Sequence, residues 1–259
     1  MKEKIDLVDA SKIREVIKFS LTNKISYENP RMGIISVGQT PRVSMMSELR
    51  SLLPGIQLIE RGALDDTSED EIYSSKAVGD APGLVTKLRS GESVVVSKAL
   101  VSSRTTIAVQ KLEVEDKCDA ILIACTGEFS EIPHSKPLIV SGHAVYYTVR
   151  ELAEKYNRVS IICPLPEQIG LVEEKFSRLP SIRKLQVQNC SPYAENIYNF
   201  LEVGRKFKEN GSDLIILDCM GYTREQRNFL AEKTGVQVVH ARYAAAEFAA
   251  EMLKLLGAK

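Results

Sequence analysis

The sequence predicts an α/β protein in which two pseudo-symmetric lobes with parallel sheets surround a central cleft. Three observations favour this fold class. Apolar runs with the length of buried strands alternate with helical stretches from Met32 onward. One segment of the first half recurs in the second half without a gap, and a strand followed by a proline turn opens each half. The length of 259 residues is enough for two such lobes.

The expected strands are short apolar runs bounded by polar or turn-forming residues. They are residues 32–37, 57–60, 93–96, 120–124, 137–140, 159–163, 185–187, 214–217 and 236–239. Helical stretches lie between most of them, for example 144–156 and 193–210. Residues 62–92 contain the acidic run DDTSEDE and the Gly/Pro-bearing run VGDAPG, which favour loops around short helices.

The chain is expected to divide into an extension and two lobes. Residues 1–31 form an N-terminal helical extension, because the apolar residues of IREVIKFSL recur at helical spacing. This helix either packs on the body of the protein or contacts a second copy of the chain in a homodimer. Lobe 1 is predicted at 32–140, with the C-terminal helical segment 241–259 returning to it. Lobe 2 is predicted at 141–240.

Charge and composition argue against several classes of function. Thirty-four basic residues balance thirty-four acidic ones, so no overall positive field attracts nucleic acid or an anionic membrane. The N-terminal stretch MKEKIDLVDASKIREV has charges where a signal peptide has an apolar run. Five cysteines without CxxC spacing argue against a disulfide framework and a zinc site, and no GxGxxG or GxxxxGK[ST] pattern supports a nucleotide cofactor. We therefore expect a cytoplasmic protein with reduced thiols, no metal and no cofactor.

The internal repeat is the most informative feature of the sequence. DAILIACTGEFSE at 119–131 aligns with DLIILDCMGYTRE at 213–225. Both copies read as an aspartate, a buried strand, a cysteine, any residue, a glycine, and a glutamate six positions after the cysteine. The cysteines are Cys125 and Cys219. Duplication alone would also preserve them as packing residues, but the matching polar turns favour a functional role.

Ligands of open parallel sheets bind beyond the carboxyl ends of the strands, where these cysteines are expected. A helix that begins there supplies free N–H groups and a positive dipole, so we expect lowered thiol pKa values. Glu131 and Glu225 are then expected in the first turns of the two helices. If the lobes face each other, one thiolate can remove the proton from a carbon next to a carboxylate while the opposite thiol returns one.

Such a reaction also needs groups that hold the carboxylate and stabilise its developing charge. Arginine suits this role because its guanidinium binds a carboxylate through two hydrogen bonds. The candidates are Arg42, in the first turn of a helix after Pro41, and Arg104. Threonines at these turns either bind the ligand or cap helices. The further substrate-binding candidates are Gly38, Gln39, Thr40, Ser103, Thr126, Gly127, Gly221 and Thr223.

The runs VGQTPR, LVSSRTT and LDCMGYT resemble the AroM family, a branch of the aspartate/glutamate/hydantoin racemase superfamily. The resemblance covers residues of about 32–256. It implies an Asp/Glu racemase-like fold and a cofactor-independent racemase or isomerase, with Cys125 and Cys219 as the acid/base pair. Racemases of the superfamily usually continue the first cysteine with Asn-Thr, whereas this chain continues with Thr126-Gly127. A small carboxylate is therefore the expected ligand, rather than an amino acid specifically.

A second class of function uses the same cleft. A non-catalytic sensor would bind a small carboxylate linked to aromatic amino acid metabolism and respond by closing its lobes. Deuterium exchange at the carbon next to the carboxylate distinguishes the two classes, because only the enzyme exchanges that hydrogen.

Overall fold

The computed structural model describes residues 29–75, 83–193 and 196–255. The predicted helix of the N-terminal extension lies outside the described residues, as does the end of the C-terminal segment. None of the helices within the described ranges is long and apolar enough to cross a membrane.

The first sheet has four parallel strands in the order β2-β1-β5-β6. Its two central strands are apolar and almost entirely buried, as expected where helices cover both faces of a parallel sheet. Ile34 of β1 pairs with Glu60 of β2 on one side and with Leu122 of β5 on the other. The strands are β1 (Arg31–Ser36), β2 (Gln57–Gly62), β5 (Ala120–Ala124) and β6 (Leu138–Val140).

The second sheet repeats this arrangement. Its four parallel strands follow the order β10-β9-β7-β8, so the first strand of each half is central and pairs with the strand that precedes a cysteine turn. The predicted fold class, with two pseudo-symmetric α/β lobes, is therefore confirmed. The strands are β7 (Arg158–Cys163), β8 (Lys184–Asn189), β9 (Leu214–Leu217) and β10 (Gln237–His240).

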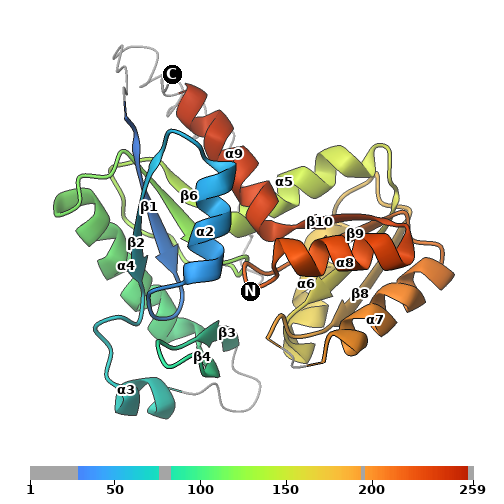
Figure 1. Ribbon diagram of the computed structural model, residues 1–259, viewed down its shortest axis with the longest axis horizontal. Helices are drawn as coiled ribbons and strands as arrows, with labels where there is room; N and C mark the ends of the chain where they lie inside the picture. Colours follow the sequence, from blue (N-terminus) through green and yellow to red (C-terminus); the bar gives the residue numbers. More distant parts are fainter. Residues whose placement is uncertain (1–28, 76–82, 194–195, 256–259) are drawn as a thin grey trace, which may run out of the picture.

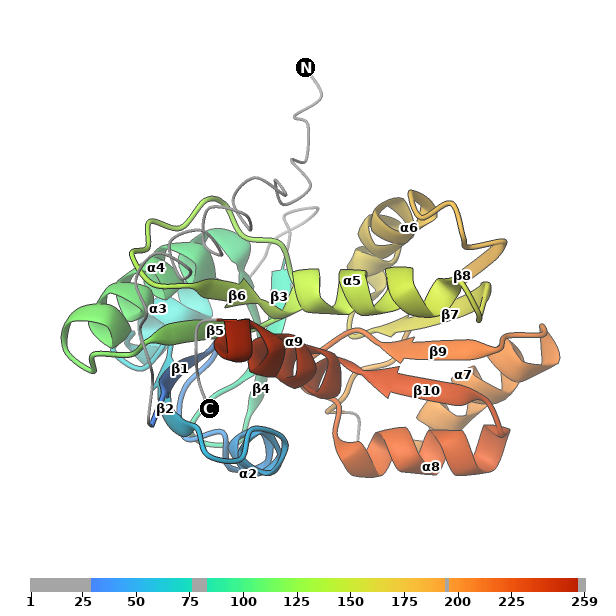
Figure 2. The same cartoon turned by 90° about the horizontal axis from the view of Figure 1, so that it is seen from above.

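Helices cover both sheets, and two of them lie between the lobes (Figure 1). The first half contributes α2 (Val43–Leu52), α3 (Glu69–Ser74) and α4 (Lys98–Val114). The second half contributes the short 3-10 helix η1 (Pro166–Gln168), α6 (Ile169–Ser177), α7 (Ile197–Glu209) and α8 (Arg224–Thr234). The two central helices are α5 (Ser141–Ala153) and α9 (Ala241–Leu255), which lie side by side between the sheets (Figure 2).

A shared core joins the two lobes. One cluster of buried side chains contains Ile34 of the first sheet, Ile161 of the second sheet, Val145 of α5 and Ala245 of α9. Two smaller clusters lie beneath α4 in the first lobe and beneath α7 and α8 in the second. Because α5 and α9 belong to the shared cluster, the assignment of α5 to lobe 2 and of α9 to lobe 1 stays a prediction.

The hairpin of β3 (Gly83–Lys87) and β4 (Ser93–Ser97) corrects one expectation. The run at 93–96 is a strand, but it pairs antiparallel with β3 and belongs to neither parallel sheet. β3 itself lies in the segment where the sequence indicated only loops and short helices. The hairpin reaches the second lobe, because the Gln168 side chain donates a hydrogen bond to the Gly83 carbonyl at 3.4 Å.

Candidate functional site

The two cysteine turns have the same local geometry. Cys125 follows β5, and the N–H of Gly127 donates a hydrogen bond to the Cys125 Sγ at 3.4 Å. Cys219 lies two residues beyond β9, and the N–H of Gly221 donates to the Cys219 Sγ at 3.3 Å. In each turn, a backbone N–H two residues after the cysteine is therefore available to stabilise a thiolate.

The turns meet between the lobes. The Thr126 hydroxyl donates a hydrogen bond to the Asp218 carbonyl at 3.0 Å, which joins the residue after one cysteine to the residue before the other. The two thiols are also close enough to interact electrostatically, since negative charge on Cys219 raises the pKa of Cys125. The structure thus brings Cys125, Thr126 and Gly127 together with Cys219 and Gly221.

The environment of the two thiols is poorly solvated, although Cys125 is buried and Cys219 is only half-buried. Cys125 is only 9% exposed, and burial raises the pKa of its thiol to about 12, although the N–H of Gly127 opposes the increase. Burial likewise raises the pKa of Cys219 to about 11, against the N–H of Gly221. The charges of Arg42 and Arg242 also lower the pKa of Cys219.

The prediction that helix N-termini lower these pKa values is wrong. The segment between Cys125 and β6 is not helical, and α8 begins only at Arg224. Burial therefore has the dominant effect on both thiols. For the same reason, Glu131 does not lie in the first turn of a helix, whereas Glu225 does lie in the first turn of α8 as expected.

Arg42 connects the site to the second lobe. It lies at the N-cap of α2, one residue before the predicted first turn, and its side chain donates to the hydroxyls of Tyr193 at 2.9 Å and Thr86 at 3.3 Å. Lys87 of β3 lies over the Tyr193 ring, 5.1 Å from its centroid. Tyr193 was not expected at the site, because it precedes α7 with no motif around it.

Lys98 is a second cation that sequence reasoning missed. It is the first residue of α4, half-buried, and its charge lowers the pKa of Cys125. Its position beyond a strand end is the sequence signal that could have identified it. Arg104 instead forms an ion pair with Glu71 of α3 at 2.6 Å, and the Ser103 hydroxyl donates to the Leu100 carbonyl. Within the described ranges, no hydrogen bond or ion pair joins either residue to the cysteine turns.

The loop after β1 contacts its own lobe. A Cβ on Gly38 would lie 2.3 Å from the Thr86 Oγ1, so the backbone packs directly on the hairpin. The Gln39 side chain donates to the Leu64 carbonyl and accepts from the N–H of Arg89. The Thr40 hydroxyl donates to the Asp65 carboxylate at 2.9 Å. These contacts shape the loop that carries Arg42.

The remaining candidates lie around the second turn. Thr223 is the N-cap of α8, where it forms a capping box with Gln226, so its capping alternative is the one that the structure shows. Gly221 allows the Tyr193 hydroxyl to approach closely, since a Cβ there would lie 2.9 Å from that oxygen. Asp218 is 4% exposed, its Oδ1 has no partner among the described residues, and burial raises the pKa of its carboxyl group.

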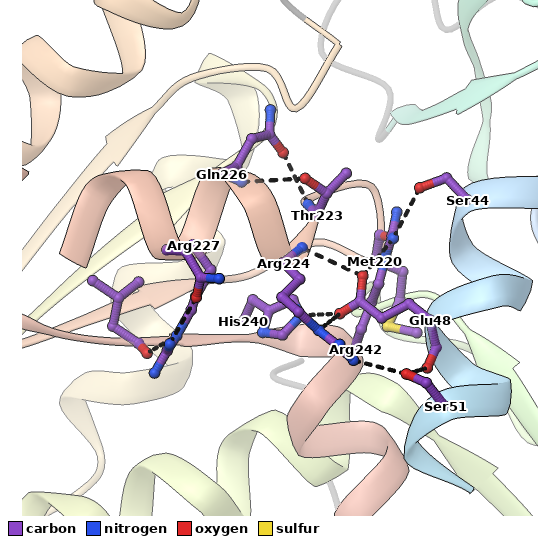
Figure 3. A network of polar contacts seen from close by, with 12 residues as sticks. Ser44, Glu48, Ser51, Met220, Thr223, Arg224, Gln226, Arg227, His240 and Arg242 are labelled. Carbon is purple, nitrogen blue, oxygen red and sulfur yellow. Dashed lines mark hydrogen bonds and ion pairs between the residues drawn. The ribbon is translucent and has the colours of Figure 1, made fainter. Parts of the chain in front are cut away.

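A buried polar network holds the Cys219 turn against the first lobe (Figure 3). Glu48 of α2 accepts hydrogen bonds from His240 at 2.5 Å and from Arg242 at 2.9 Å. Arg242 also donates to the carbonyls of Met220 at 2.8 Å and Gly221 at 3.2 Å. Glu48, His240 and Arg242 are each less than a tenth exposed, so the charges are paired within the protein rather than with water.

Two further features bear on the choice of site. Among the residues that the structure describes, no group of three or more His, Cys, Asp or Glu side chains is arranged to hold a metal ion. A groove of about 750 Å³ is lined by α5, β10 and α9, with aromatic walls that include Tyr147 and Phe248 but neither Cys125 nor Cys219. The groove contains neither thiol, whereas the cysteine turns have the acid/base groups and lie near Arg42 and Lys98, which form no ion pair among the described residues. The chemistry therefore favours the turns.

Comparison with known proteins agrees with the topology. The family model described as AroM protein matches residues 32–253. No curated protein matches the sequence. The fold is similar to allantoin racemase from Klebsiella pneumoniae, with a TM-score of 0.58 and 15% identity over 89% of this chain and 94% of that chain.

Two other solved structures have the same architecture. The maleate isomerase Iso from Pseudomonas putida S16 has a TM-score of 0.58 and 14% identity over 87% of this chain and 93% of that chain. Glutamate racemase from Aquifex pyrophilus has a TM-score of 0.54 and 12% identity over 88% of this chain and 87% of that chain. At these identities the similarity shows a racemase-like fold.

Proposed function

We propose, from the premise that the chain belongs to the AroM family, that this protein is a cofactor-independent racemase or isomerase. It would act at the carbon next to a carboxylate, with Cys125 and Cys219 as its acid/base pair. The observation that carries the proposal is the meeting of the two turns, since the Thr126 hydroxyl donates to the Asp218 carbonyl at 3.0 Å and each turn directs an N–H to its own sulfur.

Two opposed thiols allow a balanced proton transfer. The Cys219 thiolate takes the proton from the substrate carbon, and the electron pair of the broken C–H bond delocalises into the carboxylate. The Cys125 thiol then gives its proton to the opposite face of the carbon, which inverts the centre and leaves Cys125 as the thiolate. The reverse sequence converts the other enantiomer. The hydrogen bonds from Gly127 and Gly221 support whichever sulfur is negative.

The cations around the turns would bind the carboxylate and its developing charge. Among the described residues, the Arg42 side chain donates to two neutral hydroxyls and forms no ion pair with an acid. The charge of Lys98 acts on Cys125, and those of Arg42 and Arg242 act on Cys219, so each thiol has at least one cation nearby. In a buried site such charges act through a low dielectric and stabilise an enolate-like transition state more strongly than they would in water. Structural neighbours named as racemases and isomerases support this reaction class.

Deuterium exchange tests the proposal directly. Candidate substrates, beginning with aspartate, glutamate, hydantoins and aromatic acids, are incubated with the protein in deuterated water. The true substrate should gain deuterium at the carbon next to the carboxylate, as read by proton NMR. Cys125→Ser and Cys219→Ser should each abolish inversion, because a serine hydroxyl is too weak an acid to replace a thiol. Each variant should retain exchange on one enantiomer at most, since one thiol remains.

Cys190→Ser is the matched control, because Cys190 follows β8 outside both turns. It should leave inversion unchanged. Tight binding of an acid by the wild-type protein without any exchange would contradict catalysis and identify a sensor of small carboxylates.

A further inference from the structure

A single peptide group joins Arg242 to the Cys219 sulfur. The carbonyl of the Met220–Gly221 peptide accepts a hydrogen bond from the Arg242 Nε at 2.8 Å. The N–H of the same peptide group donates to the Cys219 Sγ at 3.3 Å. Since a peptide group is planar, fixing its carbonyl also fixes the direction of its N–H. A cation on the carbonyl further polarises the group and strengthens the N–H as a donor.

Arg242 is itself held rigidly. Its guanidinium also donates to the Gly221 carbonyl at 3.2 Å and to Glu48 at 2.9 Å, and it is only 3% exposed (Figure 3). Glu48 comes from α2 of the first lobe and also receives the N–H of Arg224 at 3.3 Å, at the start of α8. The orientation of the Met220–Gly221 peptide therefore depends on a chain of contacts that begins in the opposite lobe.

The first cysteine turn has no such support. Gly142 occupies the position in the first lobe that corresponds to Arg242. Arg242 is the second residue of α9, which follows β10, and Gly142 is the second residue of α5, which follows β6. A Cβ on Gly142 would lie 2.5 Å from the Thr126 carbonyl oxygen, so bare backbone covers this carbonyl. Among the described residues, no side chain donates to the Thr126 carbonyl.

We propose that Arg242 is a positioning residue for Cys219: it acts through the Met220–Gly221 peptide to direct an N–H at the sulfur and so favours ionisation of Cys219. The inference rests on the proposed function only for the catalytic meaning of that ionisation. The difference between the two turns stands on their contacts alone.

Other charged or titratable groups also face the two residues and must be kept constant in a test. Cys219 faces Arg42 from the start of α2, Tyr193 from the loop before α7, and its neighbour Asp218. Negative charge on Cys219 also raises the pKa values of Cys125 and of Cys163, which lies at the end of β7. Arg242 faces Glu48, and His240 and Arg224 share that carboxylate.

Competitive alkylation of the ligand-free protein tests the proposal without a substrate. The full chain is treated with limiting iodoacetamide at several pH values, and mass spectrometry of the peptides gives the rates at Cys219 and Cys125. Opening of the site would expose both thiols together, because the turns meet there. It should therefore leave the ratio of the two alkylation rates unchanged. In Arg242→Gln, we expect this ratio to fall about tenfold, as for a thiol whose pKa is one pH unit higher. Its pH profile should move upward accordingly.

Arg227→Gln is the matched control. Arg227 also donates to a carbonyl, that of Val238 at 2.9 Å, but this carbonyl lies outside the cysteine turns. An equal fall of the ratio in Arg227→Gln would overturn the proposal, because it would indicate general loosening. If Arg242→Gln does not fold, Arg242→Lys replaces it, since lysine keeps the charge and loses the fork.

We expect an intermediate ratio in Arg242→Lys, and an unchanged ratio in either folded Arg242 variant overturns the positioning role. The outcome is separate from the proposed activity. A changed ratio without any deuterium exchange keeps the positioning role and rejects racemisation. If exchange is lost only in the cysteine variants and the alkylation ratio of Arg242→Gln is unchanged, racemisation is kept and the positioning role is rejected.

Discussion

The two cysteine turns have the same backbone hydrogen bond and very different surroundings. Gly127 and Gly221 each donate an N–H to the sulfur two residues earlier. The peptide behind Cys219 is held by Arg242, whereas the carbonyl behind Cys125 packs against the bare backbone of Gly142. The repeat therefore preserves the hydrogen bond within the turn, while residues outside the repeat hold the two turns in different ways.

The segments after the cysteines also differ. In the second lobe, Thr223 caps α8 and Gly235 ends it in a left-handed conformation, so a complete helix connects the turn to β10. In the first lobe, residues between Cys125 and β6 form no helix. A duplicated cysteine turn thus does not require a duplicated helix, because the Gly N–H supplies the contact with sulfur in both cases.

The largest effect should come from removing the acid of the buried network. Glu48→Ala leaves Arg242 and His240 buried without their carboxylate, and breaking a buried pair costs about 3–5 kcal/mol. The comparison beside the other turn is Lys175→Ala, which removes one hydrogen bond to the carbonyl of Gly142, the residue that packs on Thr126, and should cost about 1 kcal/mol. Urea unfolding measures both. Equal losses would show that the two turns are supported to the same extent.

A smaller effect is expected at the glycine that covers the first turn. Gly142→Ala places a methyl group 2.5 Å from the Thr126 carbonyl oxygen, and relieving such overpacking typically costs about 1–3 kcal/mol. Gly170→Ala is the control, because Gly170 is also the second residue of its helix and nothing lies within 4 Å of an added Cβ. It should not destabilise the protein. Thermal unfolding gives the melting temperatures of both variants. Equal melting temperatures would contradict the close packing of Gly142 against Thr126.

The smallest effect concerns the pH dependence of stability. Burial raises the pKa of Glu48, but the hydrogen bonds and charges of His240 and Arg242 outweigh it, and the net pKa is lowered from 4.5. The folded protein thus gains stability from the Glu48 carboxylate above the unfolded value, and loses it as the pH falls through the folded value. The difference in unfolding free energy between wild type and Glu48→Gln should therefore shrink as the pH falls below roughly 5.

Glu60 of β2 provides a control with the opposite sign. Burial raises its net pKa above 4.5, so its contribution is most favourable below the unfolded value and is lost as the pH rises through the folded value. The difference between wild type and Glu60→Gln should shift toward greater wild-type stability as the pH falls. A parallel pH trend in the two glutamine variants would contradict the lowered pKa of Glu48.

Local patterns were sufficient to predict much of this protein. The strands at 120–124 and 214–217 agree with the structure, because continuous runs of Ile and Leu are buried wherever a parallel sheet places them. The gapless repeat indicated both cysteines and both glycines before any contact was known. The hairpin of β3 and β4 was not predicted, because its pairing depends on which strand lies beside which rather than on the composition of either.

By itself, the sequence determined the two-lobed α/β fold and the residues that make up the two cysteine turns, since both depend on residues that are adjacent or regularly spaced. Only the tertiary structure showed that burial raises the thiol pKa values, and that Tyr193 and Lys98 lie near the thiols. It also joined Glu48 to Arg242, residues separated by 194 positions. Solvation and long-range pairing depend on how distant segments pack, and no local sequence pattern encodes that packing.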